Sequence, residues 1–263
     1  MKQLLMIPDL RELATSVQLA KRWSLGFEFN DFFSPAVLDN GAAREDILRA
    51  YSAVQLPSLR TMHGAFFDVI PCSLDHGIRE VSALRIDQSI AAARAIAAGA
   101  VVFHTNYNPQ LNTPAYIDLW LRENAAFWSG VLQRNPDISI YLENMFDTSP
   151  TLLEQLSQEL SRCPNYGVCL DYAHASLSPT PCAVWAERLG RFVRHIHLND
   201  NDLKSDLHLA WGDGKIDRSE FYRCYERYLQ GASVLLEVST LARAERSLAV
   251  LEADGFHCPS AEA

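Results

Sequence analysis

The sequence lacks paired cysteines and any long apolar run. Its six cysteines are scattered without a C-x-x-C pair, which indicates reduced thiols rather than a disulfide framework or a cysteine-rich zinc site. The opening stretch MKQLLMIPDLRE has only a short apolar segment before Pro8, too short for the core of a secretory signal, and no later segment approaches the length of a membrane span. We therefore expect a cytoplasmic protein that does not cross a membrane.

Positive charge is also scarce. Lys and Arg number 23 against 32 Asp and Glu, which gives a net charge of −9, and this charge repels the phosphate backbone of nucleic acids. Hydrophobic residues make up 48% of the chain, enough for a sizeable core. The length suits one large domain spanning residues 1–263. We therefore expect a globular protein that acts on small molecules, with nucleic acid an improbable partner.

Several catalytic motifs are missing. The sequence has no strand leading into G-x-G-x-x-G, no P-loop, no serine nucleophile elbow and no H-E-x-x-H helix, which disfavours the chemistries that depend on them. What it does have is a repeated alternation of short apolar runs with longer helical patterns. The predicted strands are 4–7, 25–29, 58–63, 100–104, 138–143, 167–171, 193–197 and 234–237, and the clearest helices are 78–98, 116–133, 150–161 and 241–253. This order predicts a closed (β/α)8 TIM barrel, with an open doubly wound sheet as the alternative.

Metal-ligand and acid/base side chains stand at the ends of the last six predicted strands. In a barrel of this kind the carboxyl ends of the strands converge on one face, which carries the active site. We therefore expect these side chains to share one mouth, although each alone would also suit the polar edge of a strand. They are His63, His104, Glu143, Asp171, His197 and Glu237.

Two of these residues carry the sharpest signal. Glu143 and Glu237 each follow an apolar run, where a carboxylate is costly to bury unless a cation or strong hydrogen-bond donors lie beside it. His63 and His104 could equally be strand-end histidines that are hydrogen-bonded to backbone. In the stretch DYAH, Asp171 and a nearby histidine could both face the mouth or form an ordinary helix cap with a surface histidine.

The stretch HIHLNDNDLKSDLH, residues 195–208, is the densest group of ligand-type side chains. Of its first two histidines, we expect His197 to face the barrel interior and His195 to pack towards the helices. Asp206 and His208 should reach the same side of an extended loop, unless the segment is simply a solvated acidic loop. The following WGDGKID supplies glycines for tight turns, and its Asp217 is placed to cap the next helix.

The combination of carboxylates and imidazoles suits a hard or borderline divalent cation. No cysteine belongs to the predicted set, which argues against a thiolate zinc site. We expect zinc or manganese, with between one and three ions bound.

The motifs YLENMFD, GVCLDYAHA, HIHLND, SDLHLAWGDGKID and LLEVS, together with MHGAFFDVIP and VVFHTNYNP, resemble the xylose-isomerase-like barrel superfamily, which groups sugar isomerases and epimerases with endonuclease IV. The resemblance covers nearly the whole chain and implies an endonuclease-type three-metal ligand set. In that set His63 and His104 share Glu143 with a second site made by Glu143, Asp171, His197 and Glu237, and the third site is His174, Asp206 and His208. The one-metal sugar epimerases imply only the middle four, with His174 as a substrate contact.

The form HLNDND followed by D-x-H and G-x-G is most similar to the isomerase/epimerase-like branch, and the sequence has no clear counterpart of DNA-penetrating loops. We therefore predict a metal-dependent isomerase or epimerase of a small sugar or sugar phosphate, with Glu143 and Glu237 exchanging a proton through an enediolate. The alternatives are an endonuclease IV-like phosphodiesterase acting on abasic DNA and a barrel that binds its ligand without turnover. A homo-oligomer is possible. Five residues in neighbouring loops are candidates to bind substrate, namely Arg79, Tyr107, Asn108, Lys204 and Trp211.

Overall fold

Eight parallel strands form a closed barrel in the order β1 to β8. The computed structural model describes residues 2–66 and 69–257, so Phe67 and Asp68 of the MHGAFFDVIP motif lie outside the described residues, as does Cys258. The barrel confirms the predicted (β/α)8 architecture and excludes the open sheet. The strands are β1 Leu4–Met6, β2 Gly26–Phe29, β3 Arg60–His63, β4 Ala100–His104, β5 Ser139–Glu143, β6 Tyr166–Asp171, β7 Val193–Leu198 and β8 Ser233–Leu236.

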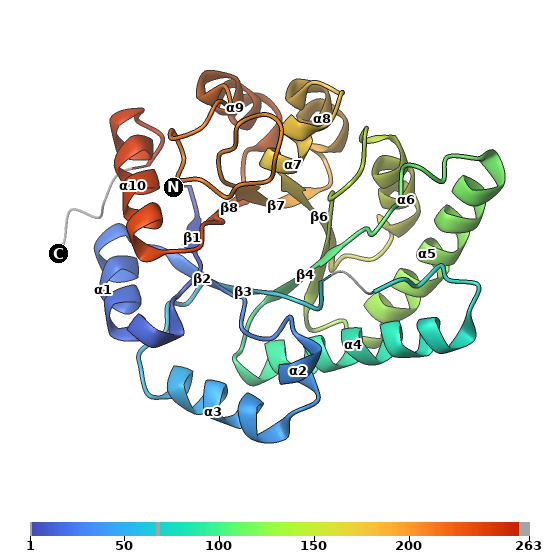
Figure 1. Cartoon of the computed structure of the whole chain (residues 1–263), viewed down its shortest axis with the longest axis horizontal. Helices are drawn as coiled ribbons and strands as arrows, with labels where there is room; N and C mark the ends of the chain where they lie inside the picture. The colour runs from blue at the N-terminus through green and yellow to red at the C-terminus, as the bar shows by residue number, and fades with distance from the viewer. Residues whose placement is uncertain (1, 67–68, 258–263) are drawn as a thin grey trace.

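The helices form a ring outside the barrel (Figure 1). The four helices predicted from hydrophobic periodicity are all present, with shifts of a few residues at some ends. The helical segments are η1 Leu10–Glu12, α1 Leu13–Trp23, α2 Pro35–Leu38, α3 Gly41–Ser52, α4 His76–Ala95, α5 Pro114–Arg134, α6 Thr151–Leu160, α7 Tyr172–Leu177, α8 Cys182–Leu189, α9 Arg218–Cys224, the π-helical η2 Tyr225–Leu229 and α10 Leu241–Ala253. Within the described residues, none of them has the length and apolar character that a membrane crossing requires.

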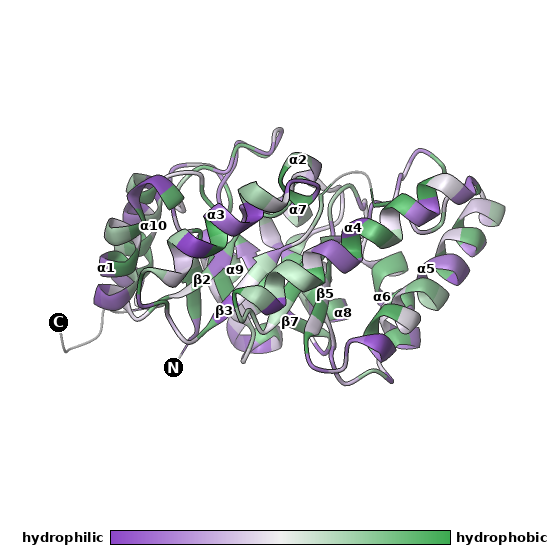
Figure 2. Cartoon of the chain, turned by 90° about the horizontal axis from the view of Figure 1, so that it is seen from below, coloured by the Kyte–Doolittle hydropathy of each residue, from purple (hydrophilic) through white to green (hydrophobic). Residues whose placement is uncertain are grey.

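The strands are short and almost wholly buried, because helices cover their outer face while side chains fill the interior. Figure 2 shows α2 and α7 at one end of the barrel and the N-terminus towards the other. Helix α7 begins directly after β6, so the end that carries α7 is the mouth formed by the carboxyl ends of the strands.

The strand register brings predicted site residues to the same height. His104 on β4 pairs with Glu143 on β5, and Asp171 on β6 pairs with His197 on β7. Neighbouring strands lie about 4.8 Å apart, so side chains paired in this way can share a ligand. Barrel closure therefore assembles at one level residues that are far apart in the sequence.

A candidate metal centre at the barrel mouth

Four side chains form what we call the central site: Glu143, Asp171, His197 and Glu237. They come from the ends of β5 to β8, and each is at most 8% exposed. Nδ1 of His197 lies 3.5 Å from Oε2 of Glu143 and 3.4 Å from Oε2 of Glu237. Ligand atoms of Glu143, Asp171 and His197 all lie within 4.8 Å of one another, close enough to hold one ion. The structure therefore brings the predicted central four together.

A second group lies on the other side of Glu143. Nε2 of His63 is 3.3 Å from Oε2 of Glu143, and Nε2 of His104 is 3.6 Å from the same oxygen. These three residues also have ligand atoms within 4.8 Å of one another. Glu143 consequently stands between two candidate metal positions, as the predicted bridging residue would.

The third group, which we call the outer cluster, consists of His174, Asp206 and His208. Oδ2 of Asp206 is 3.3 Å from Nε2 of His174 and 3.0 Å from Nε2 of His208. It is more open than the central site, since the side chains of Asp206 and His208 are each about one-third exposed. All nine predicted ligand side chains thus gather around the mouth in three adjacent groups.

Backbone carbonyls fix the direction of three of these histidines. Nδ1 lies within hydrogen-bonding distance of a carbonyl oxygen in His63 (Gly64 O, 3.1 Å), His174 (Asn144 O, 3.0 Å) and His208 (Glu237 O, 3.0 Å). An Nδ1–H that donates to a carbonyl leaves Nε2 as the unprotonated atom of a neutral imidazole. In all three residues that atom faces a carboxylate of the site, so each imidazole presents a lone pair to the mouth.

Asp171 combines the two roles that the sequence left open. Its Oδ1 accepts from the backbone N–H of His174 at 2.6 Å and so caps α7. Its Oδ2 lies 3.5 Å from Nδ1 of His174, towards the site. Capping the helix therefore leaves the second carboxylate oxygen available to a ligand.

Charge is concentrated in this buried mouth. Burial opposes ionisation of Glu143, but the imidazoles of His197 and His104 outweigh it and hold the pKa of Glu143 well below its ordinary value. Burial raises the pKa of Asp171 to about 7. Burial likewise disfavours the charged form of His197, yet Cys169, Glu143 and Glu237 raise its pKa well above normal. The carboxylates therefore need a positive partner, which is either a proton on an imidazole or a cation.

The donor set fits a divalent cation. Among the described residues, both carboxylate oxygens of Glu143, Oδ2 of Asp171 and Nδ1 of His197 are buried without a partner in hydrogen-bonding geometry. Buried polar atoms are rarely left unsatisfied unless an ion, a water or a ligand completes them. Carboxylate and imidazole ligands together suit zinc or manganese, so these residues fit the predicted class of metal.

The loop between β7 and α9 is organised by Asp200 rather than by its predicted ligands. The Asp200 carboxylate accepts from the backbone N–H groups of Asn201, Gly212 and Ile216 at 2.9 to 3.1 Å. A Cβ on Gly214 would collide with that carboxylate, which explains the second glycine of WGDG. Asp217 caps α9 as predicted, by accepting from Glu220 N. Some of the aspartates in this stretch therefore shape the loop, while Asp206 and His208 face the mouth.

One prediction for this stretch is wrong. His195 does not pack towards the helices but lies fully buried in the barrel interior, where its Nε2 is 3.0 Å from Oε2 of Glu28. Side chains two residues apart on a strand point to the same side, so His195 and His197 both face inward. Arg194, between them, is exposed instead.

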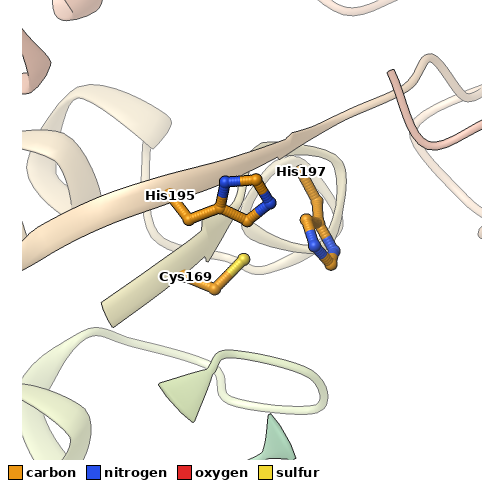
Figure 3. Close-up of side chains that lie close together, drawn as sticks. All are labelled: Cys169, His195 and His197. Atoms are coloured by element: carbon orange, nitrogen blue, oxygen red, sulfur yellow. The ribbon is translucent and has the colours of Figure 1, made fainter. Parts of the chain in front are cut away.

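Two functional-type residues escaped the sequence analysis. Glu28 on β2 is fully buried beside both histidines, with its Oε1 3.0 Å from Nε2 of His197. Cys169 on β6 points between the same two rings (Figure 3), and ligand atoms of Cys169, His195 and His197 lie within 4.8 Å of one another. Both residues could have been found, since Glu28 lies in an apolar run and Cys169 is two residues before Asp171 on the same strand.

The five predicted substrate-binding residues are placed differently from one another. Lys204 and Asn108 are exposed on loops, and Arg79 at the start of α4 donates to the carbonyl of Ser73 at 2.6 Å. Trp211 is completely buried and its indole N–H donates to Tyr222 at 3.0 Å. Tyr107 is buried against the rings of Tyr116 and Trp120 on α5. Trp211 and Tyr107 therefore have packing roles in this structure.

Comparisons with known proteins agree with this architecture. The chain is 28% identical over 203 residues, 73% of its length and 68% of the relative's, to the uncharacterised protein MJ1311 of Methanocaldococcus jannaschii. It is similar to the TTHB071 protein of Thermus thermophilus, whose structure followed soaking with ZnCl2, at 25% identity and a TM-score of 0.74 over 96% of this chain and 97% of that one. A D-tagatose 3-epimerase-like protein matches at 22% identity and a TM-score of 0.76 over 96% of both chains. The model of the xylose isomerase-like TIM barrel family matches residues 18–253, so the chain belongs to that family.

Proposed function

We propose that this protein is a divalent-metal-dependent isomerase or epimerase of a small polyhydroxylated carbonyl compound, a sugar or sugar phosphate. The observation that carries the proposal is the pair of buried carboxylates, Glu143 and Glu237, on either side of His197 Nδ1 at the barrel mouth. Two carboxylates that flank one position can remove a proton from a bound substrate and return it elsewhere.

Glu143, Asp171, His197 and Glu237 would hold the principal ion, for which we propose zinc or manganese. When bound there, a divalent cation supplies Lewis acidity, which lowers the pKa of a C–H bond next to a substrate carbonyl. The zinc-soaked relative from Thermus thermophilus makes zinc the first ion to test.

The chain's own carboxylates would move the proton. One of Glu143 and Glu237 accepts the proton from the carbon next to the carbonyl, and the C–H electron pair becomes part of an enediolate. The other carboxylate returns a proton to the opposite face for epimerisation, or to the adjacent carbon for isomerisation. No net oxidation occurs, so neither an oxidant nor a reductant is needed.

A carbohydrate substrate is supported by the structural relative described as D-tagatose 3-epimerase-like. Hydroxyl groups also suit the polar surroundings of the mouth, where Asp206 and His208 are partly exposed. For direct substrate contacts we propose Arg79, Asn108 and Lys204, which stay outside the hydrophobic core.

A second candidate function is a metal-dependent phosphodiesterase. It is favoured by the presence of all three ligand groups, including His63 with His104 and the outer cluster, because phosphoryl transfer uses adjacent metal ions to stabilise both the attacking and the leaving oxygen. The net charge of −9 disfavours DNA as its substrate.

Solvent exchange tests the first function. A panel of ketoses and their phosphates is incubated with the protein and zinc or manganese in D2O, and deuterium at the carbon next to the carbonyl is measured by NMR. We expect metal-dependent incorporation into at least one compound and loss of incorporation when a chelator is added. Binding of a panel member without any exchange would favour the barrel that binds without turnover.

Abasic DNA tests the second function. Protein freed of contaminating nucleases should fail to cleave an abasic duplex at physiological salt, because the acidic chain repels the phosphate backbone. Robust metal-dependent cleavage, absent from the Glu237→Gln variant, would make the phosphodiesterase the leading candidate.

A further inference from the structure

Glu28 is a buried carboxylate that lies beneath the mouth and belongs to none of the three ligand groups. It stands on β2, while its imidazole partners stand on β7. Its Oε1 lies 3.0 Å from Nε2 of His197, and its Oε2 lies 3.0 Å from Nε2 of His195 and accepts from Thr61 Oγ1 at 2.7 Å. All four residues are at most 4% exposed. A carboxylate so deeply buried is tolerated only with partners of this kind.

His197 is oriented in the opposite sense to three other histidines of the mouth. His63, His174 and His208 each turn Nδ1 to a backbone carbonyl and Nε2 to the site. His197 instead turns Nδ1 to Glu143 and Glu237 and Nε2 to Glu28. The Glu28 carboxylate therefore occupies the place that a backbone carbonyl takes for the others.

We propose that Glu28 is a positioning residue that holds His197 as the tautomer protonated at Nε2, so that the lone pair of Nδ1 points into the central site. This inference rests on the proposed function, since it assigns His197 as a ligand of the central ion. A carboxylate behind a metal-binding imidazole fixes the orientation of the ring and raises its basicity. Glu28 acts through His197 and need not touch the substrate.

His195 and Thr61 keep Glu28 in place. Nδ1 of His195 is 2.7 Å from Oγ of Ser233, so this second imidazole is held at both ring nitrogens. Rotation of the Glu28 carboxylate would break contacts with His195 and Thr61 as well as with His197. This network explains why a second histidine precedes His197 on the inward face of β7.

The position of Cys169 offers a different use of the same residues. Its thiol lies beside both imidazoles (Figure 3), and a soft metal ion bound by Cys169, His195 and His197 would draw the two Nε2 atoms or their Nδ1 atoms away from their present partners. The tests below separate this arrangement from the one that we propose.

The first test compares the zinc affinity of full-length Glu28→Gln and wild type by competition with a chromophoric chelator. The amide cannot accept from two imidazoles at once and carries no charge, so we expect zinc affinity at the central site to fall about ten- to a hundredfold. Thr61→Val is the matched control, because it removes a hydrogen bond to Glu28 but leaves both imidazole contacts; its affinity should change much less. Circular dichroism of each variant checks that the barrel is retained.

The second test reads the tautomer in the zinc-loaded wild type by long-range 1H–15N NMR of protein labelled at histidine nitrogens. We expect His197 to carry its proton on Nε2 and its zinc on Nδ1. This measurement decides the matter even if Glu28→Gln does not fold. A zinc-bound Nε2 would overturn the inference, and zinc bound to the Cys169 thiol would replace it with the alternative site.

The outcomes distinguish the inference from the proposed function on which it rests. Equal zinc affinity in wild type and Glu28→Gln, together with metal-dependent substrate exchange, would overturn the role of Glu28 and leave the function standing. A wild-type protein that binds no zinc or manganese at the central site would overturn both.

Discussion

At the scale of single residues, the mouth is built by controlling which nitrogen each histidine presents. Three imidazoles are set by backbone carbonyls that accept from Nδ1, so the chain itself fixes their direction. Asp171 divides its two oxygens between a helix cap and the site. Glu143 and Glu237 are left as the carboxylates without a structural duty of this kind, which is why we assign them to proton transfer.

Replacement of Glu237 tests that assignment. Glu237→Gln keeps the size of the side chain but removes the negative charge and the basic oxygen, so turnover of the identified substrate should be abolished. The melting temperature should change little, because the amide fills the same space. Glu245→Gln, at an exposed position of α10, is the matched control and should keep full activity. Near-normal turnover by Glu237→Gln would show that the proposed site is wrong.

At the scale of elements, the loop between β7 and α9 joins two functions. Asp200 holds its shape through three backbone N–H groups, and that shape carries Asp206 and His208 to His174 on α7. The outer cluster contains one carboxylate and is more exposed than the central site. We therefore expect it to bind a second ion more weakly.

The double variant Asp206→Asn with His208→Ala tests the outer cluster. Two of its three ligand groups are lost, so the extra ion should disappear while the central ion stays on Glu143, Asp171, His197 and Glu237. Metal titration of both proteins, followed by anomalous diffraction, measures the difference directly. Equal metal content in both, with one ion visible at saturating zinc or manganese, would mean that the loop serves substrate binding instead.

Much of this arrangement could be predicted because it depends on local patterns. Apolar runs located all eight strands, and the rule that barrel strands end at a common mouth placed Glu143, Asp171 and His197 together. The inward position of His195 was also open to prediction from the two-residue period of a strand. The partnership of Glu28 with His195 was not, because the two residues are 167 positions apart and only closure of the barrel brings them into contact.

At the scale of the whole molecule, an acidic chain gathers its imidazoles around buried carboxylates. Burial works against the charged form of His208, but Asp206 and Glu237 raise its pKa to about 9. Burial is likewise outweighed for His174, where Asp171 and Asp206 raise the pKa well above normal. These imidazoles are therefore protonated at neutral pH unless a metal ion displaces the proton. A homo-oligomeric assembly and a cytoplasmic location stay predictions.

Zinc uptake by the outer cluster should consequently depend on pH. Zinc binds a neutral imidazole, so each imidazole that is protonated below about pH 9 must lose its proton on binding. Affinity should rise between about pH 6 and 8 by about tenfold per pH unit for each proton released. Calorimetry in buffers of different ionisation enthalpy measures that release, and the Asp206→Asn, His208→Ala double variant is the control. Affinity that is flat or falls as pH rises would contradict the assignment.

The most direct test of the central claim is anomalous diffraction from crystals of the wild-type protein grown with zinc or manganese. The account predicts a peak bonded to Glu143, Asp171, His197 and Glu237 at the carboxyl ends of β5 to β8, with Nδ1 of His197 as the imidazole ligand. No peak at saturating metal, or a peak bonded only to Cys169 and His195 inside the barrel, would contradict it.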